Sequence, residues 1–463
     1  MNTTENIFHQ ETIIAQCTPQ GRGALALLRL SGNDALQIAS NLCRLASRKR
    51  LDEVSSHTVH AGWIVDQDNN HIDQVMFIVM HAPRTFTGEH VVEITCHNNQ
   101  FIIEAIVQRV LACGARIAQE GEFAKRAYLN KKIDLVQAEA INELIHANTQ
   151  QALKQSLAQL EGSLSHHITR LEQEIYKALA LSEASFEFLD EEIDFGIQIK
   201  HLIESLLKEI NILKQNFDQQ QHIRQGIRIA LIGSVNAGKS SIFNALLGKN
   251  RAIVTDIAGT TRDVIEAGVY RDGTYWTLVD TAGLRETNDV IEQEGIKRSL
   301  HEAQLADIIL LVYDHSKQLG QHEIEIYTDI ANRYAHKILI VKSKADLPTS
   351  GEGLCLPSHS THLDTSVHQQ STVSQLEAGI KSKIEAILSN AQAPFLLNQR
   401  QFNLILGLEK KLCALLPMLQ EHIPYELVSY HLKEALADFA ELTGKSITDQ
   451  GMETIFRTFC IGK

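Results

Sequence analysis

The stretch Ile229-Ala-Leu-Ile-Gly-Ser-Val-Asn-Ala-Gly-Lys-Ser-Ser-Ile-Phe-Asn244 lies near the middle of the chain. An apolar run leads into the pattern Gly-x-x-x-x-Gly-Lys-Ser, and a helix-forming segment follows. This order of strand, glycine-rich loop and helix predicts a phosphate-binding P-loop, because the glycines let backbone N–H groups turn toward phosphates. Lys239 is expected to reach the β- and γ-phosphates, and the Ser240 hydroxyl to bind Mg²⁺. The tight spacing disfavours the alternative, a glycine turn before an ordinary helix.

The composition is typical of a globular protein with several domains. At 463 residues the chain has the length of about three domains. Its apolar runs are shorter than the roughly 18 residues of a membrane span, and its first residues lack a secretory signal. The seven cysteines form no Cys-x-x-Cys pair, which favours reduced thiols and a cytoplasmic protein. A net charge of −13 disfavours broad electrostatic capture of nucleic acid, so that RNA contacts must be local or shared with a more basic partner.

The first 120 residues or so alternate between strand and helix patterns. Strands are predicted at 12–16, 23–30, 58–65, 75–80 and 91–96, and helices at 34–45 and 99–112. The alternation predicts a mixed sheet with helices on one side. Arg29, Glu93 and Lys132 interrupt or border apolar runs. They are either outward-facing charges or a pocket that positions a polar ligand, because buried charges need partners.

Two later regions have a helical pattern, one on each side of the nucleotide motifs. From Leu153 to Leu179 apolar residues recur in steps of three and four, which predicts one long amphipathic helix whose leucine stripe is core. The acidic segment 185–195 is interpreted as a solvated corner rather than a metal site. Further helices are predicted at 202–217, 373–388, 402–419 and 426–443. We therefore expect a nucleotide domain inserted into a helical domain.

Two segments after the P-loop have the composition of nucleotide switch regions. Ala258-Gly-Thr-Thr-Arg-Asp263 offers the Thr261 hydroxyl to Mg²⁺ and the γ-phosphate. The apolar run Trp276-Thr-Leu-Val-Asp280 precedes Thr-Ala-Gly283. Its terminal carboxylate is predicted to lie in the second shell of Mg²⁺, and the Gly283 N–H to sense the γ-phosphate.

The base-recognition motif follows at Ile338-Leu-Ile-Val-Lys-Ser343-Lys-Ala-Asp346. The Asp346 carboxylate is predicted to accept from guanine N1–H and the exocyclic amine, a pattern that adenine does not offer. The usual first residue of this motif is Asn, and a Ser343 hydroxyl replaces only part of its bonding. The prediction is therefore guanine, with weakened affinity. A second base-contacting loop is expected near Leu363-Asp-Thr-Ser-Val367, which matches the usual pattern poorly.

The catalytic machinery departs from that of Ras-like proteins. Leu284 stands where those proteins carry the glutamine that orients the attacking water. Charge stabilisation and a water-orienting group must then come from elsewhere. The Asn236 amide oxygen could hold a monovalent cation, and Arg262 and Arg285 are weaker candidates for an arginine finger. Three carboxylates of the second switch could orient the water: Glu286, Glu292 and Glu294.

The chain resembles the tRNA modification GTPase MnmE (TrmE) family over essentially its whole length. The GTPase blocks alone would fit several ribosome-assembly GTPases, but the N-terminal blocks and the Cys-Ile-Gly-Lys end are more specific. The matching blocks are Thr18-Pro-Gln-Gly-Arg-Gly23, Phe86-Thr-Gly-Glu89, Gly121-Glu-Phe-Ala-Lys-Arg-Ala-Tyr-Leu-Asn130, Asp134-Leu-Val-Gln-Ala-Glu-Ala140, the P-loop with Asn236, Asp256-Ile-Ala-Gly-Thr-Thr-Arg-Asp263, Asp280-Thr-Ala-Gly-Leu-Arg-Glu286 and Phe459-Cys-Ile-Gly-Lys463.

The resemblance implies a multidomain fold, α/β plus all-α. Its parts are an N-terminal α/β tetrahydrofolate-binding and dimerisation domain, a discontinuous helical domain, and an inserted Ras-like P-loop G domain. The implied boundaries are 1–122 for the N-terminal domain, 123–220 for the first helical part, 221–382 for the G domain and 383–463 for the second helical part, with its terminal motif.

The resemblance also implies roles for single residues. The K⁺ ligands would be Asn236 and the carbonyls of Thr255, Ile257 and Thr260, with Ser240 and Thr261 on Mg²⁺. Glu292 would position the water, beside Lys239 as the second catalytic residue. The folate contacts would be Arg29, Glu93, Lys132 and Lys463. The implied nucleotide-binding residues are Asn236, Ala237, Gly238, Lys239, Ser240, Ser241, Thr255, Thr260, Thr261, Asp280, Gly283, Ser343, Lys344 and Asp346.

Members of this family act with an FAD-dependent partner, MnmG (GidA). Carried over, the chain would be a K⁺-stimulated GTPase of a heterotetramer-like complex and itself a homodimer. Together the proteins would build an aminomethyl or carboxymethylaminomethyl group on C5 of the wobble uridine (position 34) of certain tRNAs. A tetrahydrofolate derivative would donate one carbon, and the partner would carry FAD and NADH. Cys460 is a possible nucleophile, although a tail cysteine is more often structural or free. The alternative is a switch GTPase that docks on RNA or the ribosome, whose usual basic appendage the sequence lacks.

Overall fold

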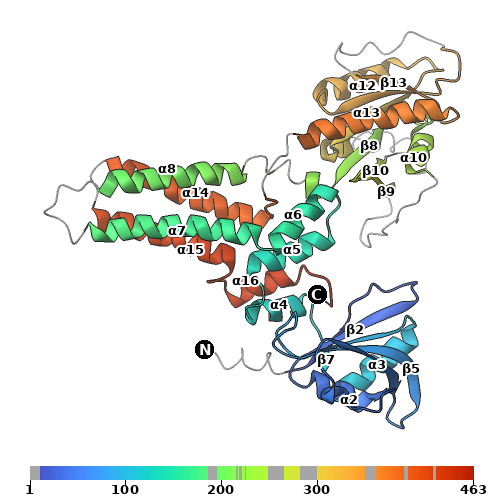
Figure 1. Ribbon diagram of the computed structural model, residues 1–463. Coiled ribbons are helices and arrows are strands. Elements are labelled where there is room, and N and C mark those ends of the chain that lie inside the picture. The colour runs from blue at the N-terminus through green and yellow to red at the C-terminus, as the bar shows by residue number, and fades with distance from the viewer. Residues whose placement is uncertain are drawn as a thin grey trace. The chain divides into compact units, whose positions relative to one another are not determined.

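The computed structural model resolves into two compact units, which are described separately (Figure 1). The first unit comprises residues 1–145, 157–208 and 403–463, and the second comprises 146–156 and 209–402. Both units contain an α/β part, and long helices complete the chain, so the predicted combination of α/β and helical parts is confirmed. The structure describes residues 11–185, 195–214, 217, 222–224, 226–248, 265–281, 300–349, 361–389, 395–420 and 424–462.

The first unit begins with a seven-stranded sheet in the order β3-β4-β5-β6-β2-β1-β7. Neighbouring strands are antiparallel except for β1 and β7, which are parallel, so the predicted mixed sheet is confirmed. The strands are β1 (Ile13–Gln16), β2 (Leu25–Ser31), β3 (Cys43–Leu45), β4 (Thr58–Val65), β5 (His71–Met80), β6 (Val91–His97) and β7 (Arg116–Ile117).

Two helices, α2 (Ala35–Leu42) and α3 (Gln100–Ala112), cover one face of this sheet. Alternate residues of β2, β5 and β6 face these helices and form the core, because successive strand residues point to opposite faces. Asn99 caps α3 with its side chain. The predicted helix 34–45 was wrong at its end: Cys43–Leu45 pairs with β4 instead, since the strand buries Leu45 and gains a hydrogen-bonded neighbour.

The opposite face of the sheet, here called the open face, combines apolar side chains with one ion pair and with the polar residues Gln74 and Thr95. Across it, Val59, Ile78, Glu93 and Arg29 lie next to one another on β4, β5, β6 and β2. Phe123 of α4 (Glu122–Leu129) lies under the Arg29 guanidinium, 5.6 Å from it. Toward β4 and β5 large apolar side chains stay exposed, namely Val59, Trp63 and Met76.

The remaining helices of the first unit include two long ones that lie side by side, α7 (Ser163–Ala184) and α15 (Tyr425–Thr443) (Figure 1). Ser182 lies near the start of α15, and Glu172 pairs with Lys445 just beyond its end, so the two helices are antiparallel. The others are α5 (Leu135–Ile145) and α16 (Asp449–Phe456), together with helices whose bounds cross into the second unit, α6 (Gln150–Leu160), α8 (Phe195–Lys214) and α14 (Gln399–Gln420).

The single helix predicted from Leu153 to Leu179 was wrong. It is broken at Gly162, whose positive φ of 99° ends α6 and begins α7. The leucine stripe is buried along α7, but Leu153 and Leu157 of α6 are nearly half exposed. A continuous apolar period therefore concealed a break between two helices.

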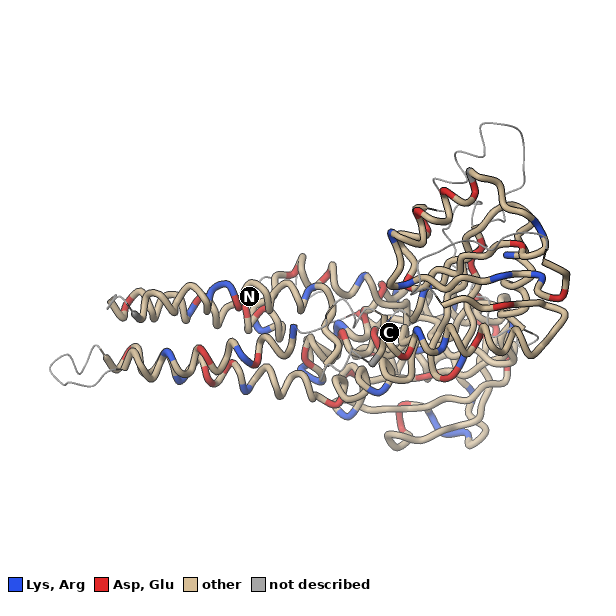
Figure 2. The backbone as a smooth tube through the Cα atoms, turned by 90° about the horizontal axis from the view of Figure 1, so that it is seen from above, with Lys and Arg blue, Asp and Glu red and all other residues tan. Residues whose placement is uncertain are grey.

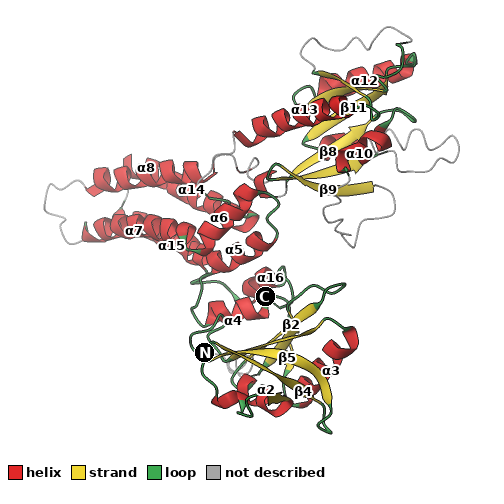
Figure 3. Cartoon of the chain, turned by 45° about the vertical axis from the view of Figure 1, so that its right-hand side comes forward, coloured by secondary structure: helices red, strands yellow, loops and turns green. Residues whose placement is uncertain are grey.

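The second unit is a six-stranded sheet in the order β13-β12-β11-β8-β10-β9, parallel except for its edge strand β9 (Figure 3). Helices α10 (Lys239–Leu247) and α13 (Gln370–Ser389) bury one face, and α12 (Gln321–Arg333) buries the other. This burial on both faces explains the continuous apolar runs of its inner strands. The strands are β8 (Ile227–Ile232), β9 (Ile265–Arg271), β10 (Thr274–Asp280), β11 (Ile308–Asp314), β12 (Ile338–Ser343) and β13 (His362–Thr365).

Charge is mixed along the backbone. Figure 2 shows Lys and Arg interspersed with Asp and Glu along the helices, rather than gathered into a stripe of one sign. Within the described ranges no helix has the length and apolar character needed to cross a bilayer.

Candidate functional site

The predicted P-loop lies at the carboxyl end of β8, where the strand order reverses between β10 and β11 and ligands commonly bind in such sheets. A side chain at Gly233 would collide with the Val312 carbonyl oxygen, so the loop leaves the strand pressed against β11. Asn236 and Gly238 adopt positive φ angles of 63° and 94°. These two residues turn the chain into α10, and Asn236 is exposed at the tip of the loop.

Lys239, the first residue of α10, is folded back along the loop. Its Nζ donates to the Gly233 and Ser234 carbonyl oxygens at 2.6 and 2.5 Å. Burial lowers the pKa of Lys239, and the nearby Asp280 carboxylate opposes that shift. An ammonium group has three donors, so two carbonyl bonds leave one for a phosphate. The two bonds thus hold the lysine side chain in one orientation along the loop.

Ser343 ends β12 and contacts the P-loop. Its Oγ lies 2.5 Å from the Ala237 carbonyl oxygen and 3.0 Å from the Tyr313 carbonyl oxygen. Both neighbours are acceptors, so the single hydroxyl proton is committed to a carbonyl. The side chain is buried. The residue that replaces the usual Asn therefore ties the base-recognition strand to the phosphate loop.

The rest of the base-recognition motif meets the segment after β13. Lys344 donates to Asp314 Oδ2 at 2.6 Å, and Ala345 N–H donates to Thr365 O at 3.3 Å. Asp346 is exposed, and a hydrogen bond from Ser366 lowers the pKa of its carboxyl group. The structure thus places the base-recognition motif next to the segment 363–367. That segment is predicted to contact the base, although its sequence matches the usual pattern poorly.

The predicted Mg²⁺ ligands are only partly within the described chain. Ser240 lies in the first turn of α10, and Asp280 is buried at the end of β10, beside Leu231 of β8. A hydroxyl and a carboxylate at one sheet edge are the hard oxygen donors that suit Mg²⁺. Ser241 follows on α10 and is exposed. Seven predicted site residues lie outside the described residues: Thr255, Ile257, Thr260, Thr261, Gly283, Glu292 and Lys463.

The second group of predicted residues lies on the open face of the first unit. Arg29 donates through Nε to Glu93 Oε1 at 2.8 Å, and its second amino group is 2.7 Å from the same oxygen. Another Arg29 nitrogen is 3.4 Å from the Gly462 carbonyl oxygen, which also accepts from Cys17 Sγ at 3.3 Å. The C-terminal segment is therefore held against the strands that carry the ion pair.

Lys132 and Cys460 are not brought into that group by any described bond. The Lys132 ammonium is exposed and donates to the Pro83 carbonyl oxygen at 2.9 Å. Its aliphatic chain passes close to Gly88, within the predicted family block. Cys460 is a free, exposed thiol two residues before Gly462.

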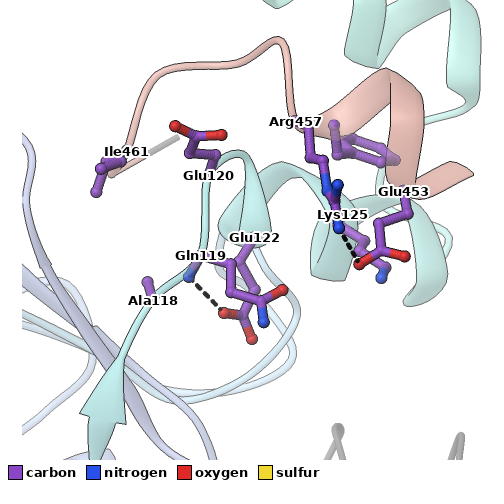
Figure 4. Close-up of a pocket in the computed structure, with 9 residues that line it drawn as sticks. Ala118, Gln119, Glu120, Glu122, Lys125, Glu453, Arg457 and Ile461 are labelled. Carbon is purple, nitrogen blue, oxygen red and sulfur yellow. Dashed lines mark hydrogen bonds and ion pairs between the residues drawn. The ribbon is translucent and has the colours of Figure 1, made fainter.

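A cavity of about 330 Å³ lies near this C-terminal segment in the first unit, and residues of that unit line it (Figure 4). It is lined by the turn before α4, by α16 and by Ile461. Charged side chains of both signs, including Lys125 and Arg457, surround it, and Arg457 is already paired with Glu453. The mixed lining gives no preference for an anion or a cation.

The sequence reasoning missed two residues that contact the nucleotide motifs. The hydroxyl oxygen of Tyr327 on α12 accepts a hydrogen bond from the Ser234 N–H at 2.6 Å. The Asp314 carboxylate at the end of β11 accepts one from the Lys344 ammonium. Asp314 follows a buried strand, a position that could have marked it. Tyr327 stands at helical spacing among apolar residues, which is the pattern of an ordinary core side chain.

Comparison with known proteins extends over both units. Residues 12–132 match the family of the GTP-binding protein TrmE N-terminus, and residues 135–460 match the MnmE helical domain. The tRNA modification GTPase MnmE of Bacillus cytotoxicus is 37% identical over 98% of this chain and 99% of its own length. That of Ligilactobacillus salivarius is 38% identical over 98% of each chain.

Solved structures match this chain only at low similarity. A GTP-binding protein of Sulfolobus solfataricus, 17% identical, has a TM-score of 0.27 and covers 58% of this chain and 80% of its own. Aquifex aeolicus Era, 20% identical, has a TM-score of 0.26 and covers 40% of this chain and 66% of its own. The assignment rests instead on the sequence matches, which span nearly the whole chain and include the P-loop. The chain is a GTPase and belongs to the tRNA modification GTPase MnmE family.

Proposed function

We propose that this GTPase is stimulated by K⁺ and acts with an FAD-dependent MnmG-type partner on the wobble uridine of tRNA, using one carbon from a tetrahydrofolate derivative. The observation that carries the K⁺ part is Asn236, an exposed amide at the P-loop tip held at a φ of 63°. Its oxygen is a suitable ligand for a monovalent cation. Such a cation would supply the positive charge that an arginine finger supplies in other GTPases.

The chain's own residues divide the work of hydrolysis. The P-loop N–H groups and Lys239 bind and orient the phosphates. The Ser240 hydroxyl would bind Mg²⁺ and the Asp280 carboxylate would lie in its second shell, and the ion would neutralise phosphate charge. Asp346 selects guanine. Leu284 offers no hydrogen bond to the attacking water, so we assign that role to Glu292.

The cation role is tested by GTP turnover of the full chain in K⁺ and in Na⁺. We expect faster turnover in K⁺ and loss of that stimulation in Asn236→Ala. Val235→Ala is the matched control, since Val235 is exposed on the same loop and offers no polar atom. Glu292→Ala should keep nucleotide binding and slow hydrolysis. Equal rates in the two cations would contradict the K⁺ mechanism.

Folate binding and dimerisation are proposed for the open face. The face combines exposed apolar side chains with a half-buried Arg29–Glu93 pair, a combination suited to an aromatic ligand with polar groups. Exposed contiguous apolar surface also favours pairing with a second copy. The tail at Gly462 would bring Lys463 to the same face, whereas Lys132 would have to leave the Pro83 carbonyl.

Equilibrium binding of tetrahydrofolate to the full chain tests this site. Arg29→Gln should weaken binding by roughly tenfold or more, because a charged partner is lost. Arg44→Gln on the edge strand β3, whose guanidinium contacts Asn69, should leave it unchanged. An equal loss in both variants would contradict the assignment.

The tRNA, the partner and a cytoplasmic location follow from the same proposal. The acidic chain, with charges of both signs mixed along its helices, favours a basic partner that supplies part of the tRNA contact. Nucleoside analysis of tRNA from a deletion strain, with and without the restored chain, tests the reaction. Unmodified nucleosides in the deletion strain are expected. Unchanged nucleosides together with absent folate binding would favour the RNA-docking switch.

A further inference from the structure

One tyrosine outside the nucleotide motifs bonds directly to the phosphate loop. Tyr327 is buried on α12, on the face of the sheet opposite α10 and α13. Its hydroxyl oxygen accepts the backbone N–H of Ser234 at 2.6 Å. Ser234 is the second residue of the P-loop, so a helix that carries no nucleotide motif is hydrogen-bonded to the loop just after β8.

The peptide between Gly233 and Ser234 is held from two directions. Its N–H points to Tyr327, and its carbonyl oxygen accepts from Lys239 Nζ at 2.6 Å. A trans peptide is planar, and its N–H and C=O groups point in opposite directions. Fixing the N–H therefore fixes the direction of the carbonyl oxygen on which the lysine ammonium rests.

We propose that Tyr327 is a positioning residue for the GTPase reaction, acting through the Gly233–Ser234 peptide to aim Lys239 at the β- and γ-phosphates. Tyr327 does not touch the nucleotide in this role. It sets the orientation of the carbonyl that directs the ammonium, so its effect depends on the phosphates that Lys239 reaches. GTP, which has the γ-phosphate, should be affected more than GDP.

The alternative is that Tyr327 merely fills the core beneath α12, as its neighbours do. The chain offers a matched control for that alternative. Tyr313 of β11 belongs to the same core cluster and is equally buried, each tyrosine having 3% of its surface exposed. Within the described part of the chain the Tyr313 hydroxyl has no hydrogen-bond partner. Replacing either tyrosine by Phe removes one buried hydroxyl, but only the change at Tyr327 frees the loop.

The experiment compares Tyr327→Phe and Tyr313→Phe in the full chain with Mg²⁺ present. Dissociation constants for GTP and GDP, steady-state turnover and thermal unfolding are measured for each. We expect Tyr327→Phe to weaken GTP binding by roughly 3- to 10-fold, the size of one lost hydrogen bond, and GDP binding by less. Turnover at saturating GTP should also fall, while Tyr313→Phe should match the unaltered protein in all three nucleotide measurements.

Three outcomes would overturn the proposal. The first is unaltered GTP binding and turnover in Tyr327→Phe. The second is an equal loss in both variants, which would indicate a generic packing effect. The third is an equal loss of GTP and GDP affinity in Tyr327→Phe together with a lower unfolding temperature, which would assign the tyrosine to the core alone.

Discussion

At the scale of single residues, Ser343 shows how a substitution in a motif changes its chemistry. An Asn side chain has two N–H donors and one acceptor, whereas Ser has one donor. Here that donor faces the Ala237 and Tyr313 carbonyl oxygens, so nothing remains to donate to N7 of a guanine base. Selection of guanine then depends on Asp346, and the weakened affinity predicted from the sequence has a specific cause.

Ser343→Asn should therefore tighten binding of GDP and GTP, by roughly fivefold, because one amide N–H can hold the Ala237 carbonyl while the other reaches N7. Calorimetry with GDP measures the gain. The control ligand is 7-deaza-GDP, which lacks the N7 acceptor and should show no gain. Equal tightening of both ligands would mean that Asn acts on the P-loop rather than on the base.

At the scale of elements, a helix start explains one family block of the N-terminal part. Gly121 precedes α4 with a φ of 63°, and a side chain there would collide with the Phe456 carbonyl oxygen at the end of α16. The close approach lets Ala124, Leu135 and Phe456 share one core. The block Gly-Glu-Phe thus encodes a contact between segments more than three hundred residues apart.

Gly121→Ala should lower the free energy of unfolding by about 3 kcal/mol, the left-handed backbone costing about 1 kcal/mol and the displaced α16 backbone the rest. Gly114→Ala is the matched control. Its φ is 98°, but nothing lies within 4 Å of the added carbon, so only the backbone cost of about 1 kcal/mol applies. Chemical denaturation followed by far-UV circular dichroism measures both. Equal losses of unfolding free energy in the two variants would show that α16 can shift away from the added side chain at no energetic cost.

At the scale of the whole molecule, each of the two units has a buried core built from its own residues. A buried network in the first unit joins Glu89, Glu122 and Arg126, and Arg116 donates to Glu122 at 2.6 and 2.8 Å. Burial raises the pKa of Glu122, but Arg116, the Gln119 N–H and Arg126 outweigh it, so the pKa lies below its ordinary 4.5. All described nucleotide-site residues belong to the second unit.

Thermal unfolding should consequently show two transitions that respond to different changes. Glu122→Gln should lower the free energy of unfolding of the first unit alone, by about 3 kcal/mol near neutral pH, because Arg126, which is buried, and Arg116 each lose one carboxylate partner. Arg126 keeps Glu89, and Arg116 keeps Glu11. GDP should raise only the unfolding temperature of the second unit, since a ligand stabilises the part that binds it. A shift of both transitions by either change would indicate that the units unfold together.

The pH dependence of that loss follows from the lowered pKa of Glu122. A carboxylate with a depressed folded pKa contributes stability above its unfolded value of 4.5, and the contribution disappears as the pH falls through the folded pKa. The difference between the unaltered protein and Glu122→Gln should therefore be largest near neutral pH and shrink below pH 4.5. Calorimetric scans at several pH values measure it. A difference that stayed constant on acidification would contradict the linkage.

The sequence by itself determined the P-loop, the order of the nucleotide motifs, the mixed N-terminal sheet and the family. These rest on local rules: glycine at a tight turn, a period of two in strands, and short motifs whose spacing is fixed by the ligand. Only the tertiary structure decided that Gly162 breaks the long helix, that residues 43–45 form a strand, and that Gly462 lies against Arg29 and Cys17. Only the tertiary structure showed that Ser343 and Tyr327 are hydrogen-bonded to the P-loop. The hydrogen-bond partner of a hydroxyl group is set by which backbone, distant in sequence, the fold places beside it, and a local sequence pattern carries no information about that contact.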